Sequence, residues 1–328
     1  MTSTPQPAGS GKNGAKEADT QGLCVMFGAL RSGTSMLRLM LNGHPRLICP
    51  GETDFLVDFL QQAPDGSWHY DLERLSENRI FRSSRANLPE TADAATAFKA
   101  MLADLRGDEP GTLVLVLHRN LGRLLDLVPD IPAIHILRDP RDVARSTIGM
   151  GWSGHVYFGT EFWMETEHEW DRNVARISED RQIETRYEDL VRDPEAALGE
   201  ISTFLGEDYD PGMLSYPDYT TYDRPDPALA EQWRRKLSPN ELGLVEPLFG
   251  DLLEGRGYTP SGEPPRTPGQ IEWLRMWVKH KRSVWRFRIN KFGLHDPLIV
   301  AIAKRVGLAH LTLPAQRRMR EITQQNLK

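Results

Sequence analysis

A short turn near the amino end of the chain has the residue types of an anion-binding loop. Residues 23–28 (LCVMFG) form a brief apolar run, and Arg31-Ser-Gly-Thr-Ser35 follows before apolar residues resume at helical spacing. A turn between a buried strand and a helix directs backbone N–H groups and the positive helix end toward a phosphate or sulfate. We therefore predict an anion site here, with an ordinary strand–helix connection as the alternative.

The same turn differs from the phosphate loop of nucleoside triphosphatases at one position. Gly28 to Ser35 match the spacing GxxxxGK[ST], but Thr34 stands where that motif has its lysine. Kinases and ATPases use this lysine on the terminal phosphates and the following hydroxyl on Mg²⁺. Because the cation comes earlier here, at Arg31, a nucleotide kinase is the less favoured alternative.

A second basic segment, IHILRDPRDVARS at residues 134–146, also leaves an apolar strand and enters a helix. Arg138 ends the strand, and Ser146 lies eight residues further along. Ligands of open α/β sheets bind at this carboxyl edge, so we predict a second anion site there. Arg141 and Arg145 are candidates either for the same ligand or for a solvated helix face.

These motifs resemble those of sulfotransferases that use PAPS (3′-phosphoadenosine-5′-phosphosulfate), whose donor loop has the sequence [K/R]-S-G-T-[T/S]. Residues 31–45 extend the similarity to tyrosylprotein sulfotransferases and their bacterial relatives, as do TRYEDL at 185–190 and WRRKLSP at 233–239. The resemblance implies PAPS as the donor and no metal. The donor-binding residues that it implies are Arg31, Ser32, Gly33, Thr34 and Ser35 for the 5′-phosphosulfate, Arg138 and Ser146 for the 3′-phosphate, Tyr187 for the nucleotide, and Trp233 and Lys236 in a closing segment.

The catalytic residues are less uniquely marked. Sulfuryl transfer requires a cation at the bridging oxygen, for which Arg31 is the candidate, and a general base. Glu52 lies where the family has its catalytic glutamate, although an ungapped alignment pairs that glutamate with Gly51. His118, after an apolar run, is either a rival base or a structural histidine. Many relatives have Lys-[T/D/S]-Pro at this point, so either Arg119 replaces the lysine or its role has moved.

The elements that must position these residues follow from apolar runs. Residues 23–28, 112–117 and 133–137 are short buried-strand patterns, and residues 121–127 form a helical pattern between two of them. We predict an α/β fold with a P-loop-like central parallel sheet flanked by helices. Three helix starts are marked by a capping residue before a proline: Asp139, Asp193 and Ser238.

The chain divides by composition into four predicted parts. Residues 1–20 are expected to be a disordered leader, 21–258 a sulfotransferase domain, 259–269 a linker, and 270–328 a basic helical extension. From residue 265 onward there are 14 Lys and Arg against 3 Asp and Glu, a net charge of +11. The whole chain carries −6, so residues 1–264 carry −17.

Composition excludes some classes of function. With 39% hydrophobic and 26% charged residues and a mild net charge of −6, this is an ordinary globular chain and not a nucleic-acid binder. Cys24 and Cys49 sit in apolar surroundings and are expected to be core thiols in a reducing, cytoplasmic compartment. The longest apolar run of the extension, residues 298–303, is too short to span a membrane.

The acceptor is marked least clearly. A Gly- and aromatic-rich stretch at residues 149–159 is expected either to bind the acceptor or to pack beneath other elements. We predict a PAPS-dependent sulfotransferase acting on a hydroxyl or amine of a small molecule, carbohydrate or lipid; a non-catalytic nucleotide-binding scaffold is the alternative. The extension is expected to pack on its own chain or a homo-oligomer partner, with peripheral membrane contact as the other reading.

Overall fold

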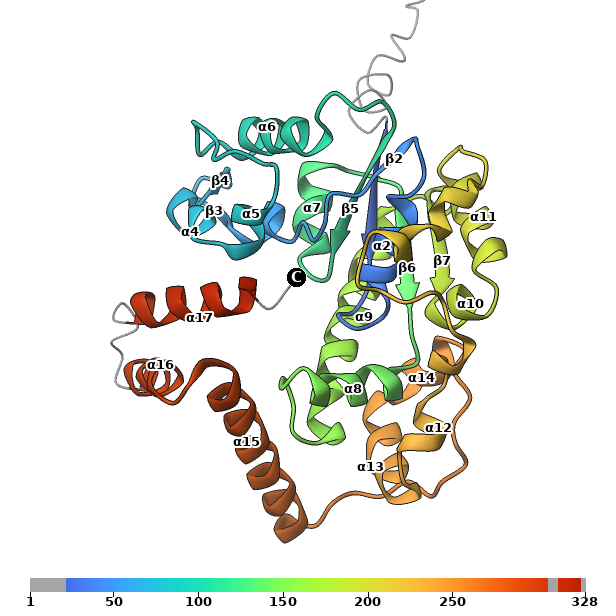
Figure 1. Ribbon diagram of the computed structural model, residues 1–328, viewed down its shortest axis with the longest axis vertical. Coiled ribbons are helices and arrows are strands. Elements are labelled where there is room, and N and C mark those ends of the chain that lie inside the picture. Colours follow the sequence, from blue (N-terminus) through green and yellow to red (C-terminus); the bar gives the residue numbers. More distant parts are fainter. Residues whose placement is uncertain (1–21, 306–311, 326–328) are drawn as a thin grey trace, which may run out of the picture.

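The computed structural model describes residues 22–305 and 312–325, so the predicted leader lies outside the described residues. In this part of the chain a five-stranded sheet has the order β2-β5-β1-β6-β7, and every neighbouring pair is parallel (Figure 1). The strands are β1 (Leu23–Phe27), β2 (Leu47–Ile48), β5 (Thr112–Leu117), β6 (Ala133–Leu137) and β7 (Gln182–Arg186). The predicted fold class is confirmed.

The three central strands form because both of their faces are apolar. Every residue of β1 and β6 is buried, as are all residues of β5 after Thr112. A parallel strand covered on both sides is a continuous apolar run, which made these strands predictable. β2 and β7 were not predicted, since β2 has only two residues and β7 (QIETR) is a largely polar edge strand.

Strand register brings distant segments to one edge of the sheet. Phe27 is level with Leu117 on β5 and with His135 on β6, and Leu137 is level with Arg186 on β7. Because all five strands run in the same direction, the residues after each strand emerge at that shared edge. The segments that start there begin at Gly28, His118, Arg138 and Tyr187.

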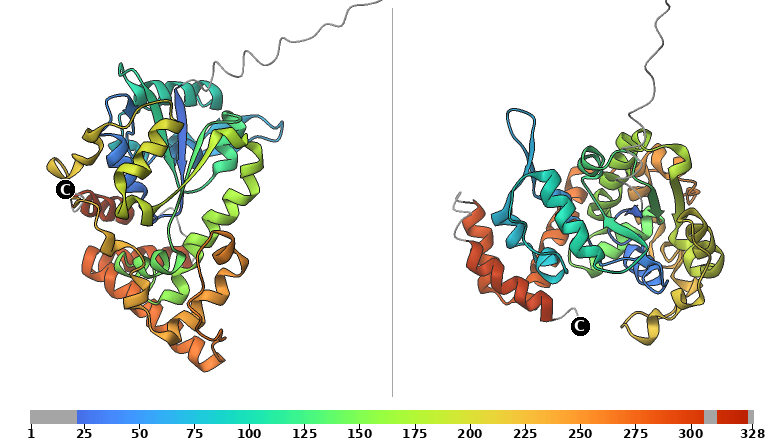
Figure 2. Two further views of the ribbon diagram at one scale, coloured as in Figure 1. Left: turned by 90° about the vertical axis from the view of Figure 1, so that its right-hand side faces the viewer. Right: turned by 90° about the horizontal axis from the view of Figure 1, so that it is seen from above.

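Helices cover both faces of the sheet (Figure 2). On one face β1 packs with α6 (Ala94–Arg106), α7 (Leu121–Leu127) and α9 (Glu161–Asn173). On the other it packs with α2 (Thr34–Leu41), α10 (Tyr187–Arg192) and α11 (Pro194–Phe204). Cys24 and Cys49 are buried and unpaired in this second core, as predicted, and burial raises the pKa of Cys49 to about 12.

The predicted helix starts are confirmed. The side chains of Asp139, Asp193 and Ser238 accept a first-turn backbone N–H of α8 (Pro140–Gly149), α11 and α13 (Pro239–Phe249), respectively. The other helices and strands are α3 (Phe55–Asp58), β3 (Leu60–Gln62), β4 (Trp68–Tyr70), α4 (Leu72–Ser76), α5 (Arg79–Ser83), α12 (Trp233–Lys236), α14 (Asp251–Gly255) and short 3-10 turns at Val156–Gly159, Val174–Arg176, Glu179–Arg181, Pro211–Leu214, Tyr216–Asp218 and Pro227–Leu229.

The carboxyl-terminal helices return to the body of the molecule. Residues 258–269 have no regular structure, and α15 (Gln270–Phe292), α16 (His295–Arg305) and α17 (Leu313–Gln325) follow (Figure 1). The Gly154 N–H donates to Nδ1 of His280 on α15 (3.0 Å), and Arg317 on α17 forms an ion pair with Glu77 (2.6 Å). The extension therefore packs on its own chain; its standing as a separate domain stays a prediction. Within the described ranges, no helix combines the length and apolarity needed to cross a membrane.

Gly28, where β1 ends, should not tolerate a side chain. A Cβ there would lie 2.5 Å from the Ile136 carbonyl oxygen on the neighbouring strand, whereas a Cβ at Gly199 in α11 would meet nothing. We expect Gly28→Ala to lower the free energy of unfolding by about 1–3 kcal/mol. The matched change Gly199→Ala should raise it by about 0.5–1 kcal/mol, because alanine favours a helix. Urea denaturation measures both, and an unchanged Gly28→Ala protein would refute the close approach.

Candidate active site

The turn after β1 has the backbone of an anion-binding loop. Gly33 is the N-cap of α2 with φ 95°, and no side chain caps the helix, so its first N–H groups are open to a ligand. A Cβ at Gly33 would lie 2.3 Å from the ring of Tyr187. Two features therefore require glycine at position 33: the positive φ angle and the close approach of the Tyr187 ring.

The predicted anion-binding residues meet at this loop. Arg31 Nε donates to Ser146 Oγ (3.0 Å), and Arg138 Nη1 donates to the carbonyl oxygen of Arg31 (3.0 Å). The Arg138 guanidinium lies 4.1 Å from the centre of the Tyr187 ring. Burial and the positive charge of Arg138 lower the pKa of Arg31, so two neighbouring cations share a partly buried site.

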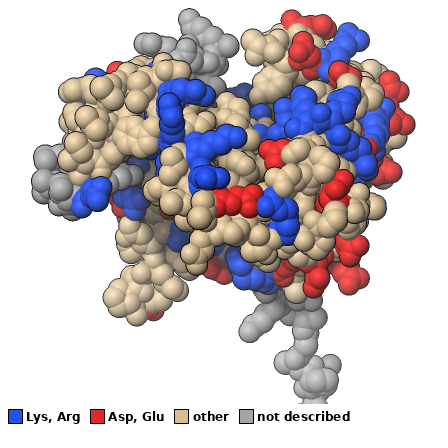
Figure 3. All heavy atoms as spheres, turned by 90° about the horizontal axis from the view of Figure 1, so that it is seen from below, with Lys and Arg blue, Asp and Glu red and all other residues tan. Residues whose placement is uncertain are grey.

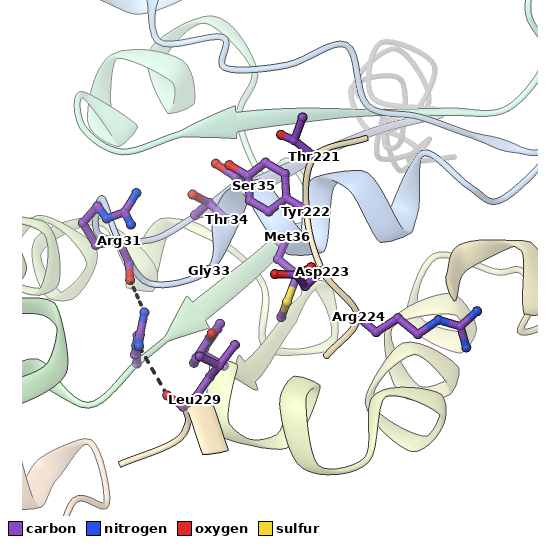
Figure 4. A pocket seen from close by; sticks show the side chains of 12 residues that line it. Arg31, Gly33, Thr34, Ser35, Met36, Thr221, Tyr222, Asp223, Arg224 and Leu229 are labelled. Atoms are coloured by element: carbon purple, nitrogen blue, oxygen red, sulfur yellow. Dashed lines mark hydrogen bonds between the residues drawn. The ribbon is translucent and has the colours of Figure 1, made fainter. Parts of the chain in front are cut away.

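A cavity of about 300 Å³ opens beside the loop (Figure 4). Its lining consists of Arg31, Gly33, Thr34, Ser35, Met36, Arg138, Tyr187, Leu229 and residues 221–224. Sequence reasoning missed residues 221–224, which form an irregular polar stretch whose only signals were an aromatic residue and an arginine. The hydroxyl of Tyr216 donates to the Asp223 carbonyl (2.8 Å) and holds this stretch at the cavity.

Ser32 and Ser146, also predicted to bind the donor, do not line the cavity. Ser32 is fully buried, and its hydroxyl has no hydrogen-bond partner among the residues described. Ser146 accepts a hydrogen bond from Arg31 Nε and is absent from the lining. Direct contact of either side chain with a donor stays a prediction.

The closing segment predicted around Trp233 lies away from the cavity lining. The Trp233 ring stacks 3.6 Å from the guanidinium carbon of Arg141, and its backbone N–H donates to Asp142 (2.7 Å). Lys236 Nζ bonds Gln232 (2.7 Å) at the surface. Contact of Trp233 and Lys236 with a donor therefore also stays a prediction.

Arg141 belongs to a buried ion-pair network. It contacts Asp139 (2.7 Å) and Glu246 (2.6 Å), and its side chain is 1% exposed. Both carboxylates neutralise it inside the protein, so of the two roles considered for Arg141, ligand contact and a solvated helix face, the structure shows neither.

A hydrogen-bonded chain joins the anion loop to a buried carboxylate. His118 Nε2 lies 3.2 Å from Thr34 Oγ1, and its Nδ1 lies 2.9 Å from Asp54 Oδ2. The His118 backbone N–H also donates to Asp54 (2.9 Å). A carboxylate only accepts, so Nδ1 carries the proton of the contact with Asp54, and Nε2 faces the Thr34 hydroxyl.

Asp54 is a site residue that the sequence analysis missed. Burial opposes its ionisation, but the hydrogen bonds and charge of His118, with the charge of Arg119, outweigh burial and lower the pKa of Asp54. The signal in the sequence was a second carboxylate two residues after Glu52. In the structure this segment runs alongside β5, where Glu52 forms a bridge with Val116.

Glu52 and Arg119 differ in how they are held. The carboxylate of Glu52 is half-buried and has no hydrogen-bond or ion-pair partner in the described part of the chain. Arg119 forms a two-point ion pair with Asp58, at 2.9 and 2.5 Å, and is absent from the cavity lining. Of the two possibilities for the family lysine, this geometry favours a moved role over replacement by Arg119.

The aromatic loop at residues 149–159 is used for packing. The Phe158 ring lies 4.8 Å from that of His280 on α15, and a Cβ at Gly151 would lie 2.2 Å from the ring of Phe287. Of the two roles expected for this loop, the structure shows packing beneath α15.

Comparison with known proteins places the chain in a family. The sequence model described as the sulfotransferase family matches residues 24–211, more than half of the chain. The chain belongs to the sulfotransferase family. The matched span contains the anion loop, Glu52, Asp54, His118, Arg138 and Tyr187, whereas residues 221–224 and Leu229 of the cavity lining lie outside it.

Curated relatives of this sulfotransferase-family chain are distant. A protein-tyrosine sulfotransferase of Drosophila melanogaster is 23% identical over 304 residues, covering 82% of this chain and 58% of the relative. Carbohydrate sulfotransferase 5 of Mus musculus is 26% identical over 179 residues, covering 42% of this chain and 45% of the relative. The chain thus spans little more than half the length of the fly protein.

Solved structures show the same fold. The sulfotransferase domain from the curacin biosynthetic pathway superimposes with a TM-score of 0.56 at 18% identity, covering 73% of this chain and 98% of that domain. The sulfotransferase domain of the Synechococcus PCC 7002 olefin synthase gives 0.52 at 24% identity, covering 69% and 94%.

Asp54 should stabilise the fold in a pH-dependent way. Its folded-state pKa is lowered, so its contribution is complete above the unfolded pKa and is lost as the pH falls through the folded pKa. We expect Asp54→Asn to lower the free energy of unfolding at neutral pH by about 1–3 kcal/mol, with the difference shrinking in acid. Urea denaturation of both proteins at neutral and at acidic pH measures this difference. Glu52→Gln, the same change at an unpartnered carboxylate, should have little effect; equal losses in both variants would contradict the Asp54 assignment.

Proposed function

We propose that this protein transfers a sulfuryl group from PAPS to a hydroxyl or amine of an acceptor. One observation carries the proposal: Arg31 and Arg138 both line a single cavity, and neither side chain forms an ion pair with a carboxylate of the described residues. A nucleotide with one anionic group at its 3′ end and another at its 5′ end would neutralise both cations. Family membership supports sulfuryl transfer as the reaction.

The chain's residues fit this donor in the following roles. The loop from Arg31 to Ser35 and the amino end of α2 would bind the 5′-phosphosulfate through backbone N–H groups. Arg138 and Ser146 would bind the 3′-phosphate, and the ring of Tyr187 would pack beside the nucleotide. Arg31 belongs to both the proposed 5′-phosphosulfate site and the proposed 3′-phosphate site, because its backbone forms the loop while its guanidinium contacts Ser146.

Bound PAPS supplies the sulfuryl group, which passes from the bridging phosphate oxygen to the acceptor. We assign the hydrogen bond on the donor side to His118, because its Nε2 already contacts Thr34 in the anion loop. Asp54 would stabilise the charge that His118 acquires as an imidazolium. In this assignment His118 takes over the role of the family lysine, while Arg119 stays paired with Asp58.

We assign the general base to Glu52. Its carboxylate has no partner among the described residues, so its lone pairs are free to accept the proton that leaves the acceptor as the new bond to sulfur forms. His118 is the rival base, as it was at the level of sequence. The turnover of the Glu52→Gln variant separates the two assignments.

Donor binding can be tested without knowing the acceptor. The product analogue 3′,5′-adenosine bisphosphate should stabilise the protein by about 2.7 kcal/mol at a concentration 100 times its Kd, and ATP-Mg²⁺ should stabilise it less. Arg138→Met should weaken bisphosphate binding by about 10–100-fold, because a charge-assisted hydrogen bond is lost. Arg176→Met, at an exposed arginine paired with Asp126, is the control and should bind normally. Preferential stabilisation by ATP-Mg²⁺ would contradict a sulfotransferase and favour a kinase.

Turnover tests the catalytic assignments. Glu52→Gln should lower kcat for transfer of labelled sulfate across a panel of phenols, sugars and lipid alcohols by about 10²–10⁴-fold, without changing bisphosphate binding. Glu73→Gln, at an exposed glutamate, should match the wild type. A near-normal kcat in Glu52→Gln would contradict Glu52 as the general base and would favour His118 in that role. Bisphosphate binding without transfer to any acceptor would support the non-catalytic scaffold instead.

A further inference from the structure

Exposed apolar side chains gather on the carboxyl-terminal helices. Thirteen large apolar side chains are exposed in the described ranges, and eight of these lie between residues 271 and 302. On α15, Ile271, Leu274 and Val278 recur at helical spacing and are 70%, 54% and 49% exposed. Leu294, Leu298 and Ile302 repeat every fourth residue at and along α16. Apolar groups concentrated in this way indicate an interaction surface.

This surface is distinct from the face with which α15 packs on its own chain. Met276 and Val284 are buried, and His280 and Phe287 contact the loop at residues 149–159. Ile271, Leu274 and Val278 lie on the opposite side of a helix with 3.6 residues per turn. The helix therefore has two apolar faces, of which the described part of the chain covers one.

The outer face of α15 is also strongly basic. The helix carries a single acidic residue, Glu272, and that residue pairs with Arg266. None of its seven cations forms an ion pair with a carboxylate among the described residues: Arg275, Lys279, Lys281, Arg282, Arg286, Arg288 and Lys291. Figure 3 shows Lys and Arg side chains interspersed with uncharged residues on the underside of the molecule. The described residues therefore supply no carboxylate partner for these cations, which leaves them available to an anionic partner.

We propose that the outer face of α15, with the exposed apolar residues of α16, docks on the surface of an anionic lipid bilayer. Helices that lie in the plane of a membrane interface combine an apolar stripe, tryptophans and flanking Lys and Arg. Here Trp273 and Trp277 stack on the same helix at the border between its two faces, where the Trp273 ring also lies 6.2 Å from that of Phe158. Lys281 lies 5.7 Å from the Trp277 ring. An anionic bilayer provides both the negative charge and the apolar layer; a nucleic acid would leave Ile271, Leu274 and Val278 uncovered.

Docking is independent of the proposed sulfuryl transfer. None of the exposed residues of α15 or α16 lines the cavity at Arg31 and Arg138. The two regions are nevertheless connected, because α15 packs on the loop that follows α8, and Ser146 of α8 bonds Arg31. When α15 is docked on a bilayer, only the loop after α8 and α8 itself would separate this helix from Arg31 of the proposed donor site.

Vesicle flotation of the full-length protein tests the proposal. We expect binding to vesicles of equal parts phosphatidylcholine and phosphatidylglycerol, little binding to phosphatidylcholine alone, and weakening by high salt. The triple variant Arg275→Gln, Lys281→Gln, Arg282→Gln should lower the partition coefficient on the order of 100-fold, from about fivefold per basic residue. Leu274→Gln with Val278→Gln should lower it by about tenfold or more, through lost apolar burial.

Matched controls separate surface docking from general effects of charge and apolarity. Leu88→Gln, at an apolar residue that is 46% exposed on the body, and the triple variant Arg74→Gln, Arg85→Gln, Arg176→Gln should bind vesicles like the wild type. All variants should keep the wild-type melting temperature, because the substituted side chains are exposed.

Three results would overturn the proposal. The first is equal binding to neutral and anionic vesicles. The second is unchanged binding in both α15 variants. The third is a dimer, seen by light scattering without lipid, that the α15 variants dissociate while the wild type ignores vesicles; that result would assign the surface to a second copy of the chain.

Discussion

The hydrogen bond from Arg138 to the carbonyl oxygen of Arg31 is the contact on which the site depends. Arg31 has φ 77°, a conformation that costs a non-glycine residue on the order of 1–3 kcal/mol and persists only where its surroundings hold it. Arg138 provides that support at 3.0 Å, and its guanidinium is itself held over the Tyr187 ring at 4.1 Å. One side chain thus joins the ends of β1, β6 and β7 at the cavity.

The presence or absence of a carboxylate partner separates the arginines around this surface by role. Arg141, one turn beyond Arg138, is neutralised by Asp139 and Glu246 inside the protein and therefore acts in packing. Arg119 is likewise neutralised by Asp58. Arg31 and Arg138 have no such partner among the described residues, and the lowered pKa of Arg31 reflects their mutual repulsion as well as burial. The proposed donor would relieve that repulsion, and its binding would then also stabilise the fold.

The carboxyl-terminal helices also carry cations without a carboxylate partner among the described residues. Arginines on the surface of the acidic body, such as Arg176 and Arg192, pair with carboxylates, whereas the seven cations of α15 are not paired within the described chain. One face of α15 completes the core beneath residues 149–159, and the other keeps its charge and apolar surface available. The proposed donor site and the proposed docking surface therefore share one feature: cations that no carboxylate of the described residues neutralises.

The sequence by itself determined the central strands, the capped helix starts and the anion loop, because each depends on a local pattern: a continuous apolar run, a capping residue before proline, or a glycine at a strand–helix turn. Arg138 and Tyr187 were accessible through the resemblance of their motifs, since they directly follow strands. Asp54, residues 221–224 and the roles of Arg141 and Arg119 were decided only by the tertiary structure. Each depends on which carboxylate, ring or carbonyl the fold brings within hydrogen-bonding distance, and residue type and spacing do not encode a contact between segments that meet only when the sheet assembles.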